Sequence, residues 1–218
     1  MREHLTLEVV DSDRAIEEAL DERKTTTRFG FLQKALAAGG TVAVGGVVIG
    51  GLPKMAVGAP GPAQDVEILN FALLLEFLEA EFYTQAVADG ALSGETLQFA
   101  RVVGAHERAH VAFLRKALGN KAIEKPTFDF KGTTEDMKKF QATAIVLEDT
   151  GVSAYNGQGP RLTKKTLAAA GSIVSVEARH AAWIRDIVGQ PPAPLAFDKA
   201  LTKQQVEAAV GRTGFIQS

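Results

Sequence analysis

The stretch 104-GAHERAHVAFL-114 contains two overlapping metal-binding patterns that predict different proteins. His106-Glu107-x-x-His110 is the zinc-protease signature, in which both histidines bind the ion and the glutamate acts as a base. The shorter pattern, Glu107-x-x-His110, places one carboxylate and one imidazole three residues apart on the same face of a helix. The rest of the chain decides between them, because each chemistry needs further ligands of its own kind.

The composition restricts both the size of the protein and the ligands available to a metal. The chain has 218 residues, of which 46% are hydrophobic, and this suits one globular domain with a single core. It has no cysteine and four histidines, so any metal must be bound by carboxylates and imidazoles. A net charge of −2 and an aromatic content of 7% argue against a nucleic-acid partner.

Residues 1–63 differ from the rest of the chain and are expected to form a separate export signal or membrane anchor. A charged start precedes the uncharged run 35–52, which is rich in Gly and Ala, and the small-residue stretch 56-AVGAPGPA-63. This order is typical of an export signal cleaved after Gly58 or Ala63, and predicts a periplasmic or cell-envelope protein. Membrane association through residues 35–52 and a soluble glycine-rich arm are the alternatives.

The segment 27-TRFGFLQK-34 resembles the twin-arginine export signal. Arg28, Phe31 and Leu32 fit that pattern, but Phe29 stands where the second arginine belongs. Export by that particular pathway is therefore less well supported than export itself.

From Asp65 onward, apolar residues recur at helical spacing and predict an all-α fold. Caps and breakers delimit four long helices, at about 65–89, 93–118, 134–156 and 163–188, and a short fifth helix at about 202–210. Thr202 and Gln205 are expected to form a capping box at the start of the fifth helix. We therefore expect a four-helix bundle over residues 64–190, with a long crossover between its second and third helices, and a C-terminal extension over 191–218.

The four long helices contain a two-helix unit that is used twice. The stretch 75-LEFLEAEFY-83 of the first helix matches 147-LEDTGVSAY-155 of the third, with Leu-Glu and Tyr at the same positions. Glu-x-x-His occurs at 107–110 in the second helix and again at 177–180 in the fourth. This repetition is a more specific signal than either short motif alone.

On a helical wheel, where successive residues are about 100° apart, each copy has two glutamates on the apolar faces of its helices. The four glutamates are Glu76, Glu107, Glu148 and Glu177. Burying several unpaired carboxylates in one core is unfavourable, at a cost of roughly several kcal/mol each, unless most are protonated or cations lie between them. Two divalent cations would balance four carboxylates, and His110 and His180 would complete the ligand set. The pattern therefore predicts a dinuclear metal site.

The order of these ligands resembles the ferritin-like di-metal carboxylate superfamily, from Asp65 to about Val188. The stretch 69-LNFALLLEFLEAEFYTQA-86 is especially similar to the bacterial ferritin-like domain family related to desiccation-associated proteins. The resemblance implies a ferritin-like bundle and a role for each candidate residue. The implied roles are terminal carboxylates for Glu76 and Glu148, bridging carboxylates for Glu107 and Glu177, imidazole ligands for His110 and His180, and hydrogen-bonding or redox-capable neighbours of the metals for Tyr83 and Tyr155.

The resemblance also implies an activity, namely oxidation of Fe(II) by dioxygen or peroxide at a di-iron site. Manganese and zinc are the alternative ions, and dismutation of peroxide by a manganese pair is the alternative reaction. A structural or stress-protective envelope protein, whose metals only stabilise the fold, is the alternative from a different class. A homo-oligomer is left open by the sequence.

The second copy of the unit argues against the protease. It reads 176-VEARH-180, so Val176 stands where the first copy has His106. An essential ligand at His106 would be missing from one half, and we expect this residue either to orient a carboxylate or to lie on the polar surface. Glu79, one turn after Glu76, is an alternative ligand, although the match between Glu76 and Glu148 favours Glu76.

Overall fold

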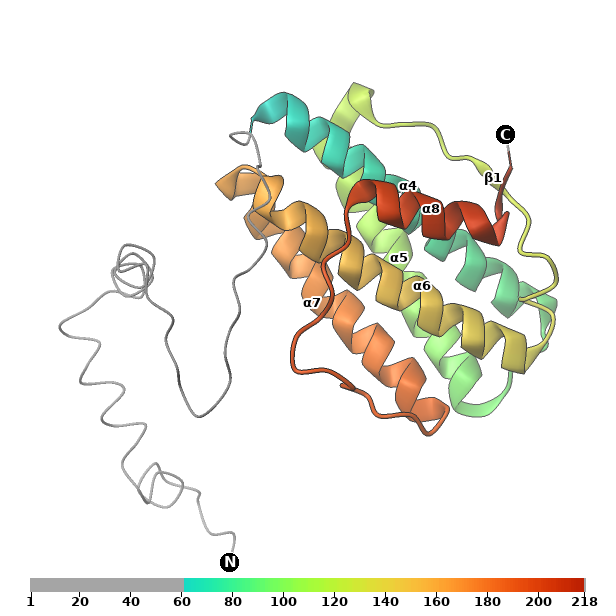
Figure 1. Cartoon of the computed structure of the whole chain (residues 1–218). Helices are drawn as coiled ribbons and strands as arrows, with labels where there is room; N and C mark the ends of the chain where they lie inside the picture. Colours follow the sequence, from blue (N-terminus) through green and yellow to red (C-terminus); the bar gives the residue numbers. More distant parts are fainter. Residues whose placement is uncertain (1–60, 218) are drawn as a thin grey trace, which may run out of the picture. The chain divides into compact units, whose positions relative to one another are not determined.

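A computed structural model describes residues 61–217, which form a bundle of four long helices (Figure 1). The bundle helices are α4 (Pro62–Asp89), α5 (Gly94–Leu118), α6 (Met137–Gln158) and α7 (Lys164–Ile187). A shorter helix, α8 (Lys203–Thr213), packs on α6. Short 3-10 turns at Gly119–Lys121 and Gly159–Arg161 follow α5 and α6. The predicted all-α fold is confirmed.

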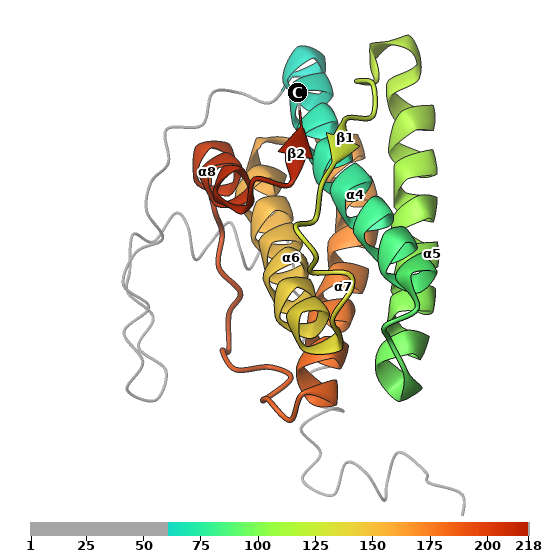
Figure 2. The ribbon, with the colours of Figure 1, turned by 90° about the vertical axis from the view of Figure 1, so that its right-hand side faces the viewer.

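The two halves of the duplicated sequence form two helical hairpins. Helix α4 packs mainly on α5, and α6 packs mainly on α7, while contacts of α4 with α6 and of α5 with α7 join the hairpins. The crossover between α5 and α6 runs along the bundle and contains the strand β1 (Thr127–Phe128), as Figure 2 shows. This is the long connection expected between the second and third helices.

Local signals in the sequence explain where most helices begin and end. Gly90 follows α4 with a φ of 73°, a left-handed conformation that glycine adopts without steric cost. Thr202 and Gln205 form the predicted capping box of α8. Helix α6 begins at Met137 rather than near Thr134, because the side chain of Asp136 accepts a hydrogen bond from the backbone N–H of Lys139 and caps the helix.

Apolar core residues lie on both sides of the middle of the bundle. One cluster is rich in aromatic rings and includes Phe82, Phe99 and Phe140, each fully buried. A second cluster joins Leu73 and Leu114 with neighbours from α7. Along each helix, the predicted metal ligands fall between these two groups, so both clusters shield the centre of the bundle from water.

The chain after α7 returns to the bundle and closes part of the core. Val206 and Phe215 are buried, and β2 (Ile216–Gln217) pairs antiparallel with β1, with Thr127 opposite Gln217. The backbone N–H of Leu201 donates to the carbonyl oxygen of Ser153 on α6, at 3.0 Å. The sequence predicted the short helix in this region but not the pair of strands.

A side chain at Gly157 is expected to displace this returning segment. A Cβ atom there would lie 1.7 Å from the carbonyl oxygen of Leu201 and 2.6 Å from its carbonyl carbon. We therefore expect Gly157→Ala to lower the free energy of unfolding by about 1–3 kcal/mol, the usual cost of overpacking. Urea denaturation followed by circular dichroism measures the change.

Gly171→Ala is the matched control, because a Cβ atom at this position of α7 meets nothing within 4 Å. It should stabilise the protein by roughly 0.5–1 kcal/mol, as alanine does at exposed positions in helices. Equal stability of the two variants would show that the contact between Gly157 and Leu201 does not hold the segment in place.

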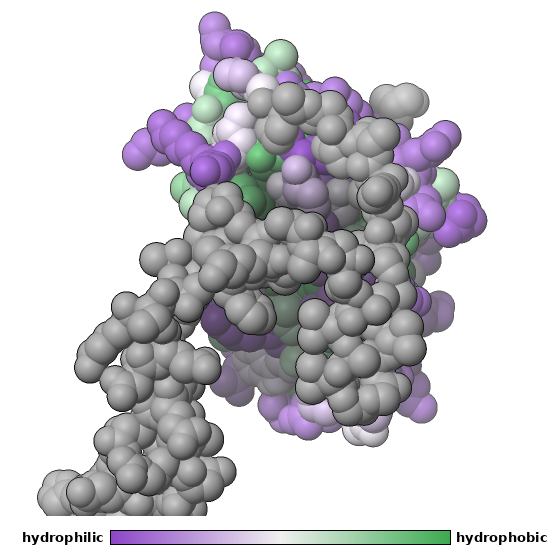
Figure 3. Space-filling view, turned by 60° about the vertical axis from the view of Figure 1, so that its left-hand side comes forward, coloured by the Kyte–Doolittle hydropathy of each residue, from purple (hydrophilic) through white to green (hydrophobic). Residues whose placement is uncertain are grey.

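Among the coloured residues of Figure 3, hydrophilic side chains gather around the edges of the view and hydrophobic ones show between them. Among residues 61–217, no helix combines the length and the apolar character that crossing a membrane requires. Residues 1–60 of the predicted export signal, including the run 35–52, lie outside the described residues. Helix α4 begins at Pro62, earlier than the predicted start near Asp65, so Ala63 belongs to the helix.

Candidate metal centre

The four bundle helices bring all six predicted ligands together in the middle of the bundle. Helix α4 supplies Glu76, α5 supplies Glu107 and His110, α6 supplies Glu148, and α7 supplies Glu177 and His180. All four carboxylates are at most 1% exposed. Their burial follows from the sequence pattern, because each glutamate lies on the apolar stripe of its helix.

The six side chains form two overlapping sets of four, and in each set one ligand atom per residue lies within 4.8 Å of the others. The first set, called here position A, consists of Glu76, Glu107, Glu177 and His110. The second set, called position B, consists of Glu107, Glu148, Glu177 and His180. Glu107 and Glu177 belong to both sets, and this is the arrangement that carboxylates bridging two ions would have.

The two oxygens of Glu107 point to different imidazoles. Its Oε2 lies 3.0 Å from Nδ1 of His110, and its Oε1 lies 3.1 Å from Nδ1 of His180. One oxygen therefore belongs to each position.

At position A, Nδ1 of His110 is close to three carboxylate oxygens at once, which one N–H cannot serve. Besides Glu107, Oε2 of Glu76 is 3.2 Å away and Oε1 of Glu177 is 3.1 Å away. Ligand atoms bound to one ion at about 2.1 Å and at right angles are themselves about 3.0 Å apart. The spacing is thus compatible with ligands around a shared ion, and also with N–H···O hydrogen bonds.

Several polar atoms of the cluster are buried and form no well-aligned hydrogen bond among the described residues, although imidazole nitrogens lie 3.1–3.2 Å from three of the oxygens. These atoms are Oε1 of Glu107, Oε2 of Glu148, both oxygens of Glu177 and Nδ1 of His180. Buried polar atoms are nearly always hydrogen-bonded in folded proteins, so a group of unpartnered lone pairs facing one another requires an explanation. Cations between them would satisfy all of these atoms, and the donor set therefore fits two metal ions.

The two tyrosines bond across the bundle to the glutamates of the opposite hairpin. The hydroxyl of Tyr83 donates to Oε1 of Glu148, and the hydroxyl of Tyr155 donates to Oε1 of Glu76 at 2.5 Å. Each of these carboxylates thus has one oxygen on a tyrosine and the other facing an imidazole. Burial, together with these carboxylates, raises the pKa of both tyrosines well above its usual value, so both remain O–H donors.

Protons take the place of the missing positive charge when no metal is bound. Burial raises the pKa of Glu76 to about 8, and also raises the pKa values of Glu148 and Glu177. Burial acts in the same direction on Glu107, but His110 and His180 outweigh it and hold the pKa of that carboxylate at about 2.

The pKa values of the two imidazoles are also raised, but by the neighbouring carboxylates and against the effect of burial. Burial tends to lower their pKa values, but the surrounding carboxylates raise the pKa of His110 to about 12 and that of His180 to about 10. The metal-free cluster therefore pairs imidazolium cations with one firmly ionised carboxylate, Glu107, and several carboxyls that tend to keep their protons.

Glu79 is a fifth buried carboxyl beside the cluster. It is 3% exposed and belongs to neither position. A Cβ atom on Gly151 would lie 3.0 Å from Oε2 of Glu177 and 3.4 Å from Oε1 of Glu79, so this glycine leaves room for both carboxyls. Burial and the neighbouring glutamates raise the pKa of Glu79 well above its usual value. When the two copies of the sequence are aligned, Glu79 falls opposite Gly151, so only the first copy carries this fifth carboxyl. The sequence therefore contained a signal for this difference between the two halves.

His106 lies outside both positions but contacts one of the imidazoles. Its exposed side chain places Nδ1 at 2.9 Å from Nε2 of His180. The sequence predicted either a partner for a carboxylate or a polar surface residue. The structure places His106 at the surface, as in the second alternative, and pairs it with an imidazole rather than with a carboxylate. The protease arrangement, with His106 and His110 on one ion, is not formed.

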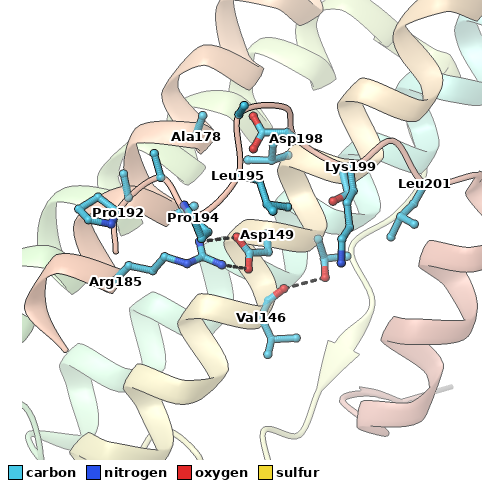
Figure 4. A pocket seen from close by; sticks show the side chains of 17 residues that line it. Val146, Asp149, Ala178, Arg185, Pro192, Pro194, Leu195, Asp198, Lys199 and Leu201 are labelled. Carbon is cyan, nitrogen blue, oxygen red and sulfur yellow. Dashed lines mark hydrogen bonds and ion pairs between the residues drawn. The ribbon is translucent and has the colours of Figure 1, made fainter. Parts of the chain in front are cut away.

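A cavity of about 460 Å³ lies elsewhere, on the outer side of α6 and α7 beneath residues 192–201 (Figure 4). Its lining includes the ion pair between Arg185 and Asp149 and the exposed side chain of Leu195, but none of the predicted ligands. The cavity is therefore separate from the carboxylate cluster.

Fold and site together define a class, that of ferritin-like helical bundles with a buried carboxylate and imidazole cluster compatible with a dimetal site. Comparison with known families agrees, since the ferritin-like domain matches residues 64–190. This match covers more than half of the chain, and the protein belongs to the ferritin-like domain family. No curated protein matches the chain.

Proposed function

We propose that the protein binds two divalent metal ions, one at position A and one at position B, and uses them to oxidise Fe(II) with dioxygen or peroxide. The observation that carries this proposal is the convergence of buried carboxylate oxygens and an imidazole nitrogen, from Glu107, Glu148, Glu177 and His180, that form no well-aligned hydrogen bond. Carboxylate and imidazole ligands suit iron and manganese, with zinc as a further alternative. A redox-active metal pair supplies one-electron steps close to the bound oxidant.

The protein's own residues prepare the site for this chemistry. The hydroxyls of Tyr83 and Tyr155 hold the two terminal carboxylates, so the free oxygens of Glu148 and Glu76 face the imidazoles. The surrounding helices exclude water, which strengthens the interaction of the carboxylates with a cation. In the overall reaction with dioxygen, two ferrous ions lose one electron each, and dioxygen takes both electrons and two protons to form hydrogen peroxide. With peroxide as the oxidant, the same two electrons and two protons give two waters.

A structural or stress-protective role is the second candidate, and the tight burial of the cluster favours it. The four carboxylates are at most 1% exposed, and His110, at 13%, is more exposed than His180. A substrate ion would have to pass between packed helices to reach the site. In this second role the metals would act only by stabilising the native state. The composition of residues 1–63 supports action in the cell envelope in either case.

Adding ferrous iron to the purified protein in air separates the two candidates. We expect the protein to oxidise the iron at least about tenfold faster than buffer, with matching oxygen uptake, and His180→Ala to lose this acceleration because it removes a ligand of position B. Ferric absorbance and an oxygen electrode give the two rates.

Glu81→Gln is the control for this measurement, because Glu81 lies on α4 but forms an exposed ion pair with Lys125. It should oxidise iron as the parent protein does. Binding of two ions without any oxygen uptake would instead assign the structural role.

A further inference from the structure

The imidazole of His180 lies between the cluster and the surface of the bundle. Its Nδ1 faces Oε1 of Glu107 and Oε2 of Glu148, at 3.1 and 3.2 Å. Its Nε2 faces Nδ1 of His106, at 2.9 Å, and the two rings are nearly parallel, at 20°. His180 is 3% exposed, whereas His106 lies at the surface of α5. The contact therefore joins an exposed imidazole to a buried one.

This contact selects one tautomer of His180. An imidazole that binds a cation through Nδ1 carries its hydrogen on Nε2, and that hydrogen needs an acceptor. Nδ1 of His106 is such an acceptor when the His106 ring is neutral. His106 thus holds the lone pair of His180 towards position B.

Position A lacks an equivalent partner. The duplicated sequence has Val176 where the first copy has His106, and a valine side chain accepts no hydrogen bond. Within residues 61–217, the hydrogen bonds of the His110 ring all involve its inner nitrogen, Nδ1. The two halves therefore supply the same ligands, two carboxylates and one imidazole each, but orient only one imidazole from outside.

We infer that His106 is a positioning residue for His180 and makes the two metal positions unequal, so that position B binds its ion more tightly than position A. The inference rests on the proposed metal pair and adds that position B takes up its ion before position A. The 2.9 Å contact between His106 and His180 and the valine at the matching position of the second copy both support this difference. Loss of an outer partner of a metal-binding histidine commonly weakens metal binding by about 10–100-fold.

Variants that retain a single complete position can test this inference with cobalt(II) ions. Glu76→Gln removes a residue of position A and leaves position B complete, whereas Glu148→Gln does the reverse. His106→Ala is then added to each. Calorimetry and the visible absorption of bound cobalt give the affinity in the full-length chain without any need for turnover.

We expect His106→Ala to weaken cobalt binding by about 10–100-fold in the Glu76→Gln protein and to change it less than about threefold in the Glu148→Gln protein. The carbonyl oxygen of glutamine in His106→Gln can accept the same hydrogen bond and should restore much of the affinity. Val176→Ala is the matched control on the second copy and should leave both affinities unchanged.

An equal effect of His106→Ala in both backgrounds, or no effect in either, would overturn the inference. Its failure can be told apart from failure of the proposed function. If the parent protein binds two cobalt ions but His106 does not distinguish them, only the inference is lost. If the parent protein binds no cobalt, iron or manganese, the metal centre itself is refuted.

Discussion

Glu107→Gln is expected to remove both metal ions, whereas Glu148→Gln should remove only the ion at position B. Glu107 directs one oxygen to each imidazole, at 3.0 and 3.1 Å, so an amide at this position removes a charged ligand from both sets. It also removes the carboxylate whose pKa is held at about 2, and thus the most firmly ionised group of the cluster. We expect both ions to bind at least about 100-fold more weakly. Loss of even a hydrogen-bond partner of a ligand, which does not touch the ion, weakens metal binding by about 10–100-fold.

The measurement is elemental analysis after incubation with manganese(II) or cobalt(II) and removal of free ions. The parent protein should retain two ions per chain, Glu148→Gln one and Glu107→Gln close to none. Glu81→Gln, whose side chain is exposed and paired with Lys125, should retain two. Full retention by Glu107→Gln would show that this residue does not bridge the two positions.

The metal-free protein is expected to lose stability as pH rises from 6.5 to 8, and bound metal should oppose this loss. The pKa of Glu76 is about 8 in the folded protein, against an ordinary value of 4.5, and those of His110 and His180 are about 12 and 10, against 6.5. A group whose pKa is raised on folding contributes stability that is complete at pH values below its pKa in the unfolded chain. This stability is lost as pH rises through its pKa in the folded protein. All three groups therefore act in the same direction across this window.

The lowered pKa of Glu107 makes stability change with pH in the opposite direction, but only at pH values below the range from 6.5 to 8. Its pKa of about 2 lies below the ordinary 4.5, so its contribution is present above pH 4.5 and is lost only as pH falls towards 2. Between pH 6.5 and 8 each extra proton on the native state changes stability by about 1.4 kcal/mol per pH unit. For a domain of this size, 1 kcal/mol corresponds to a shift of about 2–4 °C in Tm.

Thermal unfolding at pH 6.5, 7.2 and 8, with a chelator or with manganese(II), tests this expectation. Metal competes with protons for the same ligands, so the difference in Tm between loaded and metal-free protein should widen as pH rises. Glu76→Gln cannot lose a proton at this position and should show a flatter dependence in the metal-free state. A metal-free protein that becomes more stable towards pH 8 would contradict the proton-filled cluster.

The sequence predicted the bundle well because its signals are local. Gly90, Gly119 and the Thr202 capping box end or begin helices through their own backbone or side-chain preferences. The candidate ligands were also predictable, because burial of a glutamate on an apolar stripe is unfavourable without a partner, and this pattern occurs in both copies. The structure brings these residues together, and their part in metal binding is still a prediction.

Features that depend on how the helices are rotated against one another could not be read from the sequence. The contact between His106 and His180 joins α5 to α7, and the bond from Tyr155 to Glu76 joins α6 to α4. Helical periodicity gives the direction of each side chain on its own helix only. The pairing of β1 with β2 was missed because two residues per strand are too few to show an alternating pattern.

The crossed tyrosines carry a consequence for the ancestry of the chain. Tyr83 of the first hairpin secures Glu148 of the second, and Tyr155 of the second secures Glu76 of the first. A single hairpin would therefore hold its own carboxylate without the hydroxyl that fixes it, and could obtain that hydroxyl only from another copy of itself. The arrangement is the one that joining two copies of a single hairpin through a connection such as residues 119–136 would produce. His106 and Glu79 are positions at which the two copies differ.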